Sequence, residues 1–273
     1  MLAETRRQAI AEALRTNGAV TVAEVEARFG ISPMTVRRDL EELEQRGLVR
    51  RTHGGAVLPA TAAAHEDSFA RRMKISVEAK RRLADEAVAT ITALQTVFLD
   101  SSTTSFYVAR RMIDTQIAAT VLTNSLPVMD LIFNEGSPKL EIIGMGGNLR
   151  RLTRSFVGPF AVRMIQGHFA DRLFFSVKGL TETGMMTDAD ALEAEVKRAM
   201  IAQAGESTLL VDRSKMSVRG LSVIASVSEI SGVLAHGLSA ADTAHLSAGA
   251  SVRLLDDPGS ADVPPAAALP RGA

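Results

Sequence analysis

The sequence predicts two domains of different size: a small helical domain that ends in a short hairpin, and a larger α/β domain with a mostly parallel sheet. Three observations support this. Three short helices separated by glycines open the chain, short β-branched runs then alternate with amphipathic helices, and the passage between the two regions is alanine-rich and charged. With 273 residues, of which 46% are hydrophobic, the chain can fill a substantial core in the larger domain.

Composition and charge exclude several classes of protein. There is no cysteine, which excludes disulfides and thiolate metal sites and fits a reducing compartment. The five histidines show no pair at metal-ligand spacing, so we expect no metal site and no cofactor. No segment reaches about 18 uninterrupted apolar residues, and we therefore expect a cytoplasmic protein without a membrane partner. The formal net charge of +0 argues against a chain that coats nucleic acid with its whole surface, but it permits a local basic patch.

The first three helices follow from their caps and apolar spacing. An amphipathic helix that contains Ile10 and Leu14 ends at Asn17-Gly18. Thr21 can cap a second helix over Val22–Phe29, which Gly30 closes. Ser32 caps a third helix with Pro33 at its first position, and its buried stripe consists of Val36, Leu40 and Leu43.

The spacing of the second and third helices is typical of a helix-turn-helix, in which the later helix enters the DNA major groove. Its outer face carries two arginines that can pair with guanine edges or hold phosphate. After Gly47, the segment "LVRRTHGGAVL" predicts a hairpin with Gly54-Gly55 at its tip and a basic rim, a wing. The predicted DNA contacts are Thr21, Ser32, Met34, Thr35, Arg37, Arg38, Arg50, Arg51 and His53.

A simpler explanation exists for each of these signals. Exposed helix arginines usually serve solvation or pair with acids, as Arg38 could with Glu41 or Glu42, and a Gly-Gly pair is usually only a turn. The ordered combination of capped helices, glycine stops and a basic hairpin favours DNA binding over these explanations.

The larger domain is predicted over residues 76–255, after a winged domain over 1–58 and a linker over 59–75, with a disordered tail over 256–273. Ser76 can cap its first helix, Val77 to about Ala93. Strands and helices then alternate through "TVFLD", "TVLTN", "LEIIGM", "RLFFSV" and "STLLVD", the pattern of a sheet covered on both faces, before the runs "LSVIAS" and "GVLAHG" and a last helix and strand.

In such sheets the ligand site lies at the carboxyl ends of the strands. Hydroxyl groups, helix starts, glycines and cations follow five of the predicted strands, a combination that suits a small anionic polyol. Taken singly, these residues are more often caps, turns or solvated side chains. The strand-end candidates for effector binding are Asp100, Ser101, Ser102, Thr103, Thr104, Thr123, Asn124, Ser125, Gly146, Gly147, Lys178 and Lys215.

Both regions resemble one known family. The segment "SPMTVRRDLEELEQRGLVRRTHGGAV" is similar to the N-terminal winged helix of the DeoR family of bacterial transcriptional regulators, and "VFLDSSTT", "VLTNSLPV", "GGNLR", "SFVGPFA", "EAEVKRAMI" and "VDRSKM" resemble its C-terminal sensor domain. The resemblance implies a repressor with the recognition helix Pro33 to Arg46, a phosphosugar-isomerase-like sensor fold, and a phosphorylated sugar as effector. A homo-oligomer, dimer or tetramer, is expected because one winged helix contacts few base pairs.

The chain departs from the family pattern at two positions. Ser102 replaces a glycine of the family's Asp-x-Gly-Thr-Thr, and Lys178 stands where many members have an acid. Lys178 argues against the alternative function, a phosphosugar isomerase with an accessory DNA-binding segment, because proton transfer beside a carbonyl needs a base. Glu195 is a candidate surrogate base, but it fits better as a ligand contact or as part of a charged helix face with Lys197 and Arg198.

Overall fold

The computed structural model describes residues 3–17, 19–46, 48–52, 54–57, 68–243, 246 and 250–255, with the main chain alone at 15–17, 19, 50, 57 and 240. It divides into two compact units, Met1–Arg72 and Met73–Ala273. Several predictions lie outside the described residues: the helix stops at Gly18 and Gly47, the side chain of Arg50, the role of His53, the linker up to residue 67, and the tail over 256–273.

Up to residue 57, the described residues of the first unit form three helices and a three-stranded antiparallel sheet in the order β1-β3-β2. Helix α2 has the predicted bounds and ends at Gly30, and Ser32 caps α3 as predicted, whereas α3 ends at Gln45 with Arg46 as its C-cap. Strand β1 was not predicted, because three residues carry too weak a periodic signal. The elements are α1 (Ala3–Asn17), β1 (Ala19–Thr21), α2 (Val22–Phe29), α3 (Pro33–Gln45), β2 (Arg50–Thr52) and β3 (Gly55–Val57).

A small aliphatic core holds this unit together. Ile10 and Leu14 of α1 pack with Val36, Leu40 and Leu43 of α3, and all five side chains are buried. The predicted stripes therefore do face inward.

The predicted hairpin is present, with one correction at its tip. Gly55 is not a turn residue but the first residue of β3, opposite both Thr21 and Thr52. The reason is steric: a Cβ at this position would lie 2.0 Å from the carbonyl oxygen of Val20, so only glycine lets β1 approach.

The second unit is built on a seven-stranded sheet in which every neighbouring pair is parallel, in the order β15-β14-β12-β9-β4-β5-β6. Its strands are β4 (Thr96–Leu99), β5 (Ala119–Thr123), β6 (Leu140–Gly144), β9 (Ala170–Phe175), β12 (Ala204–Asp212), β14 (Gly232–His236) and β15 (Ser251–Leu255). The helices along the chain are α5 (Phe69–Arg72, assigned to the first unit), α6 (Val77–Ala89), α7 (Thr103–Asp114), α8 (Leu126–Glu135), α9 (Pro159–Gln166), α10 (Ala191–Gln203) and α11 (Ala240–Thr243), with the short 3-10 helices η1 (Arg213–Lys215) and η2 (Val227–Glu229).

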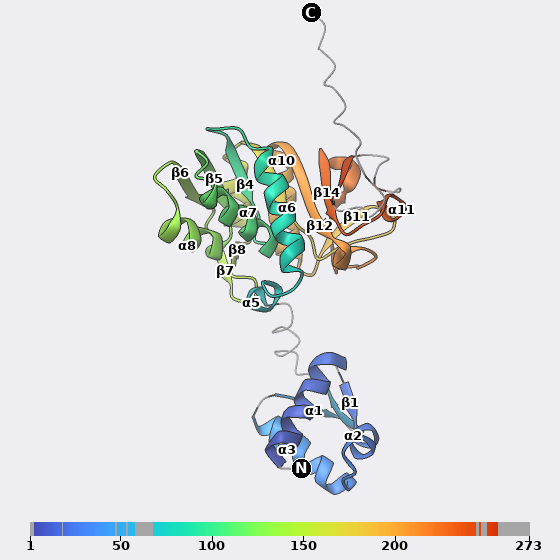
Figure 1. Cartoon of the computed structure of the whole chain (residues 1–273). Coiled ribbons are helices and arrows are strands. Elements are labelled where there is room, and N and C mark those ends of the chain that lie inside the picture. The colour runs from blue at the N-terminus through green and yellow to red at the C-terminus, as the bar shows by residue number, and fades with distance from the viewer. Residues whose placement is uncertain are drawn as a thin grey trace, which may run out of the picture. The chain divides into compact units, whose positions relative to one another are not determined.

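Helices cover both faces of this sheet, as predicted (Figure 1). Along β4, Val97 and Leu99 pack with α6, α7 and α8, whereas Phe98 points to the opposite face, where it joins α9 and α10. This alternation produces one hydrophobic core on each side of the sheet.

Two smaller sheets complete the second unit. Strands β10 (Gly179–Leu180), β11 (Met185–Asp188) and β13 (Ser222–Ser226) form an antiparallel sheet, so "LSVIAS" lies outside the large sheet. A hairpin of β7 (Asn148–Arg150) and β8 (Ser155–Val157) follows β6.

The start of the second unit also differs from the prediction. Ser76 has a left-handed conformation with φ of 49° and makes no side-chain cap, and α6 ends at Ala89 rather than near Ala93. Thr90 caps the end of the helix through its backbone, and Ile91 is buried beyond it.

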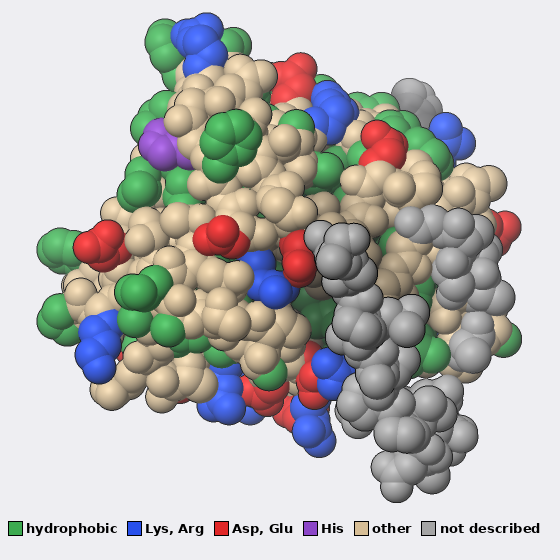
Figure 2. Space-filling model, turned by 90° about the horizontal axis from the view of Figure 1, so that it is seen from above, with side chains coloured by type: hydrophobic (Ala, Val, Ile, Leu, Met, Phe, Trp, Pro, Cys, Tyr) green, Lys and Arg blue, Asp and Glu red, His purple; other side chains and the backbone are tan. Residues whose placement is uncertain are grey.

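Acidic and basic side chains are interspersed on the face shown in Figure 2, in line with the balanced charge of the chain. None of the helices in the described residues is both long and apolar enough to cross a membrane.

Candidate DNA-binding surface and effector site

The turn between α2 and α3 is fixed by hydrogen bonds to main-chain groups. Thr21 accepts a bond from the N–H of Glu24, whose side chain in turn accepts from the N–H of Thr21, a reciprocal cap. Gly30 ends α2 with φ of 63°, and the hydroxyl of Ser32 accepts from the N–H of Thr35. The side chains of Thr21 and Ser32, both predicted DNA contacts, thus position the helices.

The outer face of α3 presents the predicted side chains. Met34, Arg37 and Arg38 are exposed, and Thr35 is half-buried beside Ser32. Neither arginine forms an ion pair with any residue that the structure describes, and Glu42, the acid one turn after Arg38, pairs with Arg46 instead. Both guanidinium groups are therefore available to DNA.

The wing is joined to the helices at its tip. The N–H of Val22 at the start of α2 donates to the carbonyl of Gly54 over 2.9 Å, and Glu44 of α3 accepts from the N–H of Arg51. The side chain of Arg51 is exposed, whereas that of Arg50 is outside the described part of the chain. This geometry presents a helix and an adjoining hairpin on one small unit, the arrangement that a winged helix uses on DNA.

In the second unit, the polar strand ends gather where the strand order reverses. After β4 the chain runs outward through β5 and β6, then returns to place β9 on the other side of β4. Asp100, directly after β4, is fully buried at this point. Its Oδ1 accepts from the N–H of Ser102 and the hydroxyl of Ser105, and its Oδ2 lies 3.4 Å from the N–H of Ser176. This is the position at which open α/β sheets bind ligands.

Lys197 of α10 brings a positive charge to this point. It is 5% exposed, and its Nζ lies 2.9 Å from Oδ2 of Asp188 and 3.3 Å from Oδ2 of Asp100. Burial acts to lower the pKa of Lys197, but the nearby carboxylates of Asp188, Asp100 and Glu193 outweigh it and raise the pKa above its usual value. The side chain is therefore an ammonium ion at neutral pH.

Glu193 completes what we call the acid-lysine cluster: Asp100, Asp188, Glu193 and Lys197. Glu193 is 2% exposed and accepts hydrogen bonds from the hydroxyls of Ser101 and Ser155, at 3.0 and 2.6 Å. Arg150 of β7 reaches the same carboxylate at 3.9 Å and Asp190 at 3.2 Å. The cluster thus joins the loop after β4, the β7–β8 hairpin and α10.

The remaining predicted residues at the ends of β4 and β5 are buried and make contacts of their own. Thr123 donates to the carbonyl of Leu99, and Ser125 caps α8. Asn124 donates to the carbonyl of Phe156, while its Oδ1 is buried without a hydrogen-bond partner among the described residues. Thr103 and Thr104 are each 4% exposed at the start of α7, and neither hydroxyl makes a hydrogen bond with a described residue.

The other residues predicted to bind the effector are less closely associated with the acid-lysine cluster. Gly146 is half-buried, and Gly147, with φ of 151°, passes so close to Val157 that a Cβ would lie 2.8 Å from its carbonyl oxygen. Lys178 and Lys215 are half-buried after β9 and on η1. Glu195 is exposed, because residues two apart lie on different faces of a helix, and the structure does not bring it to the cluster.

Glu193, Lys197 and Asp188 were not among the predicted site residues. The available signal was their place on α10: Glu193 and Lys197 lie four residues apart on the face that also carries the buried Val196 and Met200. A charged pair within an apolar stripe indicates a buried polar site.

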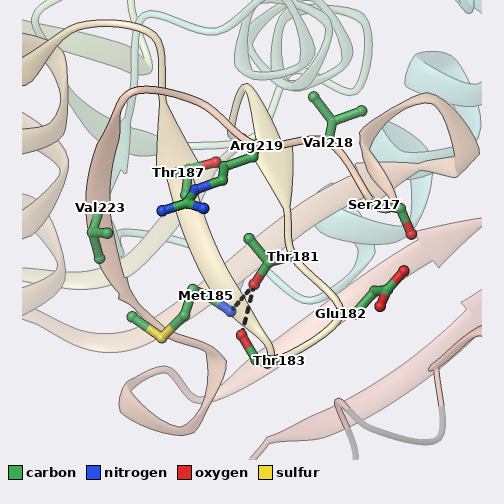
Figure 3. A pocket seen from close by; sticks show the side chains of 9 residues that line it. All are labelled: Thr181, Glu182, Thr183, Met185, Thr187, Ser217, Val218, Arg219 and Val223. Carbon is green, nitrogen blue, oxygen red and sulfur yellow. Dashed lines mark hydrogen bonds between the residues drawn. The ribbon is translucent and has the colours of Figure 1, made fainter.

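A separate hollow of about 430 Å³ lies against the small sheet of β10, β11 and β13. Figure 3 shows the hydroxyls of Thr181 and Thr183 pointing toward each other, 3.0 Å apart, with the N–H of Met185 donating to Thr181. Thr187 donates to the carbonyl of Gly179 and accepts from the N–H of Gly220. These hydroxyls hold the small sheet together, and none of the predicted effector residues lines the hollow.

A winged helix joined to an α/β domain with a buried polar site defines a DNA-binding regulator with a sensor domain. Residues 6–62 match the model of the DeoR-like helix-turn-helix domain, and residues 75–235 match that of the DeoR C terminal sensor domain. The chain belongs to the DeoR family of transcriptional regulators.

Curated relatives agree over nearly the whole length. The HTH-type transcriptional regulator GlpR of Haloferax volcanii is 34% identical, over 94% of this chain and 98% of the relative. The L-fucose operon activator of Escherichia coli (strain K12) is 30% identical over 84% of this chain and 93% of its own length. The lactose phosphotransferase system repressor of Streptococcus mutans is 29% identical, over 86% and 92%.

Among solved structures, ribose 5-phosphate isomerase A of Methanocaldococcus jannaschii overlaps 53% of this chain and 56% of its own, with a TM-score of 0.38 and 15% identity.

Proposed function

We propose that this regulator is a cytoplasmic homo-oligomeric repressor of sugar-catabolism genes, and that a phosphorylated sugar controls its binding to operator DNA. The relatives support a role in sugar metabolism, since their names refer to the fucose operon and to lactose uptake. These relatives include an activator as well as a repressor, so repression, rather than activation, is itself part of the proposal.

The observation that carries the effector proposal is the buried Oδ1 of Asn124 after β5, which has no hydrogen-bond partner among the described residues. Thr103 and Thr104, at the start of α7, follow Asp100 of the acid-lysine cluster and are nearly buried. A helix start offers free N–H groups that suit a phosphate, and carboxylates accept hydrogen bonds from sugar hydroxyls. We therefore assign the phosphate to the start of α7 and the sugar to the cluster.

The same residues favour sensing over turnover. Lys197 is held between two carboxylates and carries a raised pKa, so it does not supply a base at neutral pH. The relatives, moreover, are named as regulators.

Thermal unfolding of the full chain with a panel of phosphorylated sugars, each beside its unphosphorylated form, tests the effector. At a hundred times the dissociation constant, binding to the native state adds about 2.7 kcal/mol to the free energy of unfolding. Thr104→Val should unfold at nearly the wild-type temperature without ligand and show a smaller shift with it. Leu192→Ala, exposed on α10, is the control.

A shift from one phosphosugar, together with loss of operator affinity on its addition, would support the proposal. Equal shifts from the unphosphorylated sugars would contradict the assignment of the phosphate. If the purified chain released inorganic phosphate or isomerised the sugar, the result would favour an enzyme over a regulator.

A further inference from the structure

Helix α3 buries a charged side chain among its apolar ones. Its inward residues are Val36, Asp39, Leu40 and Leu43, and Asp39 is 3% exposed. A lone carboxylate at such a position would be strongly destabilising, because desolvation penalises the charged form.

Two arginines of α1 compensate this charge. The Nε atom of Arg6 lies 2.6 Å from Oδ2 of Asp39, and that of Arg7 lies 3.1 Å from Oδ1. Each carboxylate oxygen thus accepts from a different guanidinium group. The arginine side chains are themselves largely buried, so neither is displayed on the surface in the way that Arg37 and Arg38 are.

The ion pairs continue along the two helices, which lie side by side in the first unit (Figure 1). Arg7 also contacts Glu4, Glu4 contacts Arg46 at the end of α3, and Arg46 contacts Glu42. Helix α1 is therefore bonded to α3 both at Asp39 and one to two turns further on.

Directional bonds of this kind fix the rotation of α3 about its axis, which apolar packing alone does not. Aliphatic contacts are non-directional, and a smooth stripe allows a helix to rotate slightly about its axis, whereas charge-assisted hydrogen bonds require set distances and angles. Because Arg37 and Arg38 directly precede Asp39, any rotation of α3 that Asp39 prevents would also move these two arginines. Base recognition requires placement to within about 0.5 Å.

We propose that Asp39 is a positioning residue for DNA recognition: through Arg6 and Arg7 it holds α3 at one rotation against α1 and so aims Arg37 and Arg38 at the DNA. Buried ion pairs often add little net stability compared with apolar residues of similar size, because the charges must be desolvated. Positioning of α3 gives this ion pair a role other than stability. The inference depends on DNA binding by this unit and is independent of the effector proposal.

The test separates positioning from stability by replacing all three charges. The variant Arg6→Met/Arg7→Met/Asp39→Leu replaces the three charges with apolar side chains, and leucine keeps the branched shape of aspartate, so the variant should unfold at or above the wild-type temperature. The affinity of the full chain is measured for a duplex selected from random sequence by the wild-type protein and for a scrambled duplex of equal composition. We expect the ratio of the two affinities to fall about tenfold or more, while binding to the scrambled duplex is retained.

Single substitutions keep the test decisive if the triple variant fails to fold. Asp39→Asn retains an acceptor but loses the charge, and the affinity ratio should fall while scrambled-duplex binding stays equal or tightens. Asp39→Glu, which keeps the charge, should recover part of the ratio. Glu41→Gln removes one negative charge from the exposed face of α3 and should leave the ratio unchanged.

Two results would overturn the proposal. An affinity ratio within twofold of wild type in the folded triple variant, or in Asp39→Asn, would mean that α3 keeps its aim without Asp39. A parallel loss of affinity for both duplexes in the folded triple variant would mean that Arg6 and Arg7 contact phosphate themselves.

Discussion

The ammonium group of Lys197 on α10 lies 3.3 Å from the carboxylate of Asp100, which follows β4 at the centre of the sheet. Both side chains are almost completely buried, and Asp188 and Glu193 surround the same ammonium group. The charge of Lys197 therefore compensates Asp100 and Asp188 directly, while Glu193 also has Arg150 at 3.9 Å.

Removing that charge should destabilise the sensor domain strongly. In Lys197→Met the buried carboxylate of Asp100 loses its ion pair with the ammonium group, and breaking a buried ion pair typically costs about 3–5 kcal/mol of unfolding free energy. Urea unfolding at pH 7 measures the loss, and Lys139→Met, at an exposed position, should change stability by less than about 0.5 kcal/mol. Wild-type stability in Lys197→Met would show that the cluster carries little charge.

The pH dependence of this effect has a definite sign. A raised lysine pKa means that the stabilisation is fully present below the unfolded-state value of about 10.4 and is lost only as pH rises through the folded-state pKa. The stability that Lys197 provides should therefore stay constant from neutral pH to about pH 10.

Arg37→Ala and Arg38→Ala should each weaken operator binding by about tenfold or more, because both side chains are exposed on α3 without an ion-pair partner in the described part of the chain. Gel-shift titration gives the affinity, and unchanged thermal unfolding shows that the fold persists. Arg82→Ala, which removes an exposed arginine from α6, is the matched control. Normal operator affinity in both variants would refute the role of this helix face.

The two adjacent glycines of the wing should respond differently to alanine. Gly55→Ala places a Cβ 2.0 Å from the carbonyl oxygen of Val20, so the strands must separate, at a cost of at least about 1–3 kcal/mol. Gly54→Ala meets nothing within 4 Å and should be nearly neutral. The measurements are the unfolding of the first unit and the DNA affinity of both variants. Equal losses in Gly54→Ala and Gly55→Ala would exclude the steric explanation.

Asp171 should make the central strand pair sensitive to acid. Its Oδ2 accepts from the N–H and the hydroxyl of Thr96, and the N–H bond is the main reason that the pKa of Asp171 lies below its usual value. A lowered pKa stabilises the fold above about pH 4 and ceases to do so as pH falls through the folded-state value.

The corresponding measurement is the urea midpoint of wild type and Asp171→Asn between pH 7 and pH 3. Wild type should be the more stable at pH 7, and the two curves should converge at the acid end. A difference that stays constant across this range would mean that the charge of Asp171 does not matter. Asp114→Asn, exposed on α7, controls for the general loss of an acid.

Local chemistry explains which parts of the fold the sequence predicts well. Thr21, Gly30 and Ser32 act within one turn of their own helices, so their effect is visible in the sequence, and the bounds of α2 follow from them. Ser76 shows the limit, because a serine before a helix caps it only if the preceding chain enters in an extended conformation, and here it does not.

The candidate site was predicted in part for a similar reason. Asp100, Thr103 and Thr104 follow a strand, and the parallel sheet sets where strand ends meet. Glu193 and Lys197 reach the same point from a helix that follows the small sheet, and only the packed structure shows which face of that helix turns inward. Asp39 was missed because a charged residue beside two arginines suggests a solvated face.

The pairing of β4 with β9 also has a consequence for synthesis on the ribosome. These strands form the middle of the sheet, but β5, β6, the β7–β8 hairpin and α9 separate them along the chain. The winged helix of the first unit, from α1 to β3, has its own hydrophobic core and is complete by Val57. We therefore expect it to fold while the middle of the sensor is still being translated, at about 5–20 residues per second. A nascent or truncated chain could then occupy DNA before it can respond to any effector.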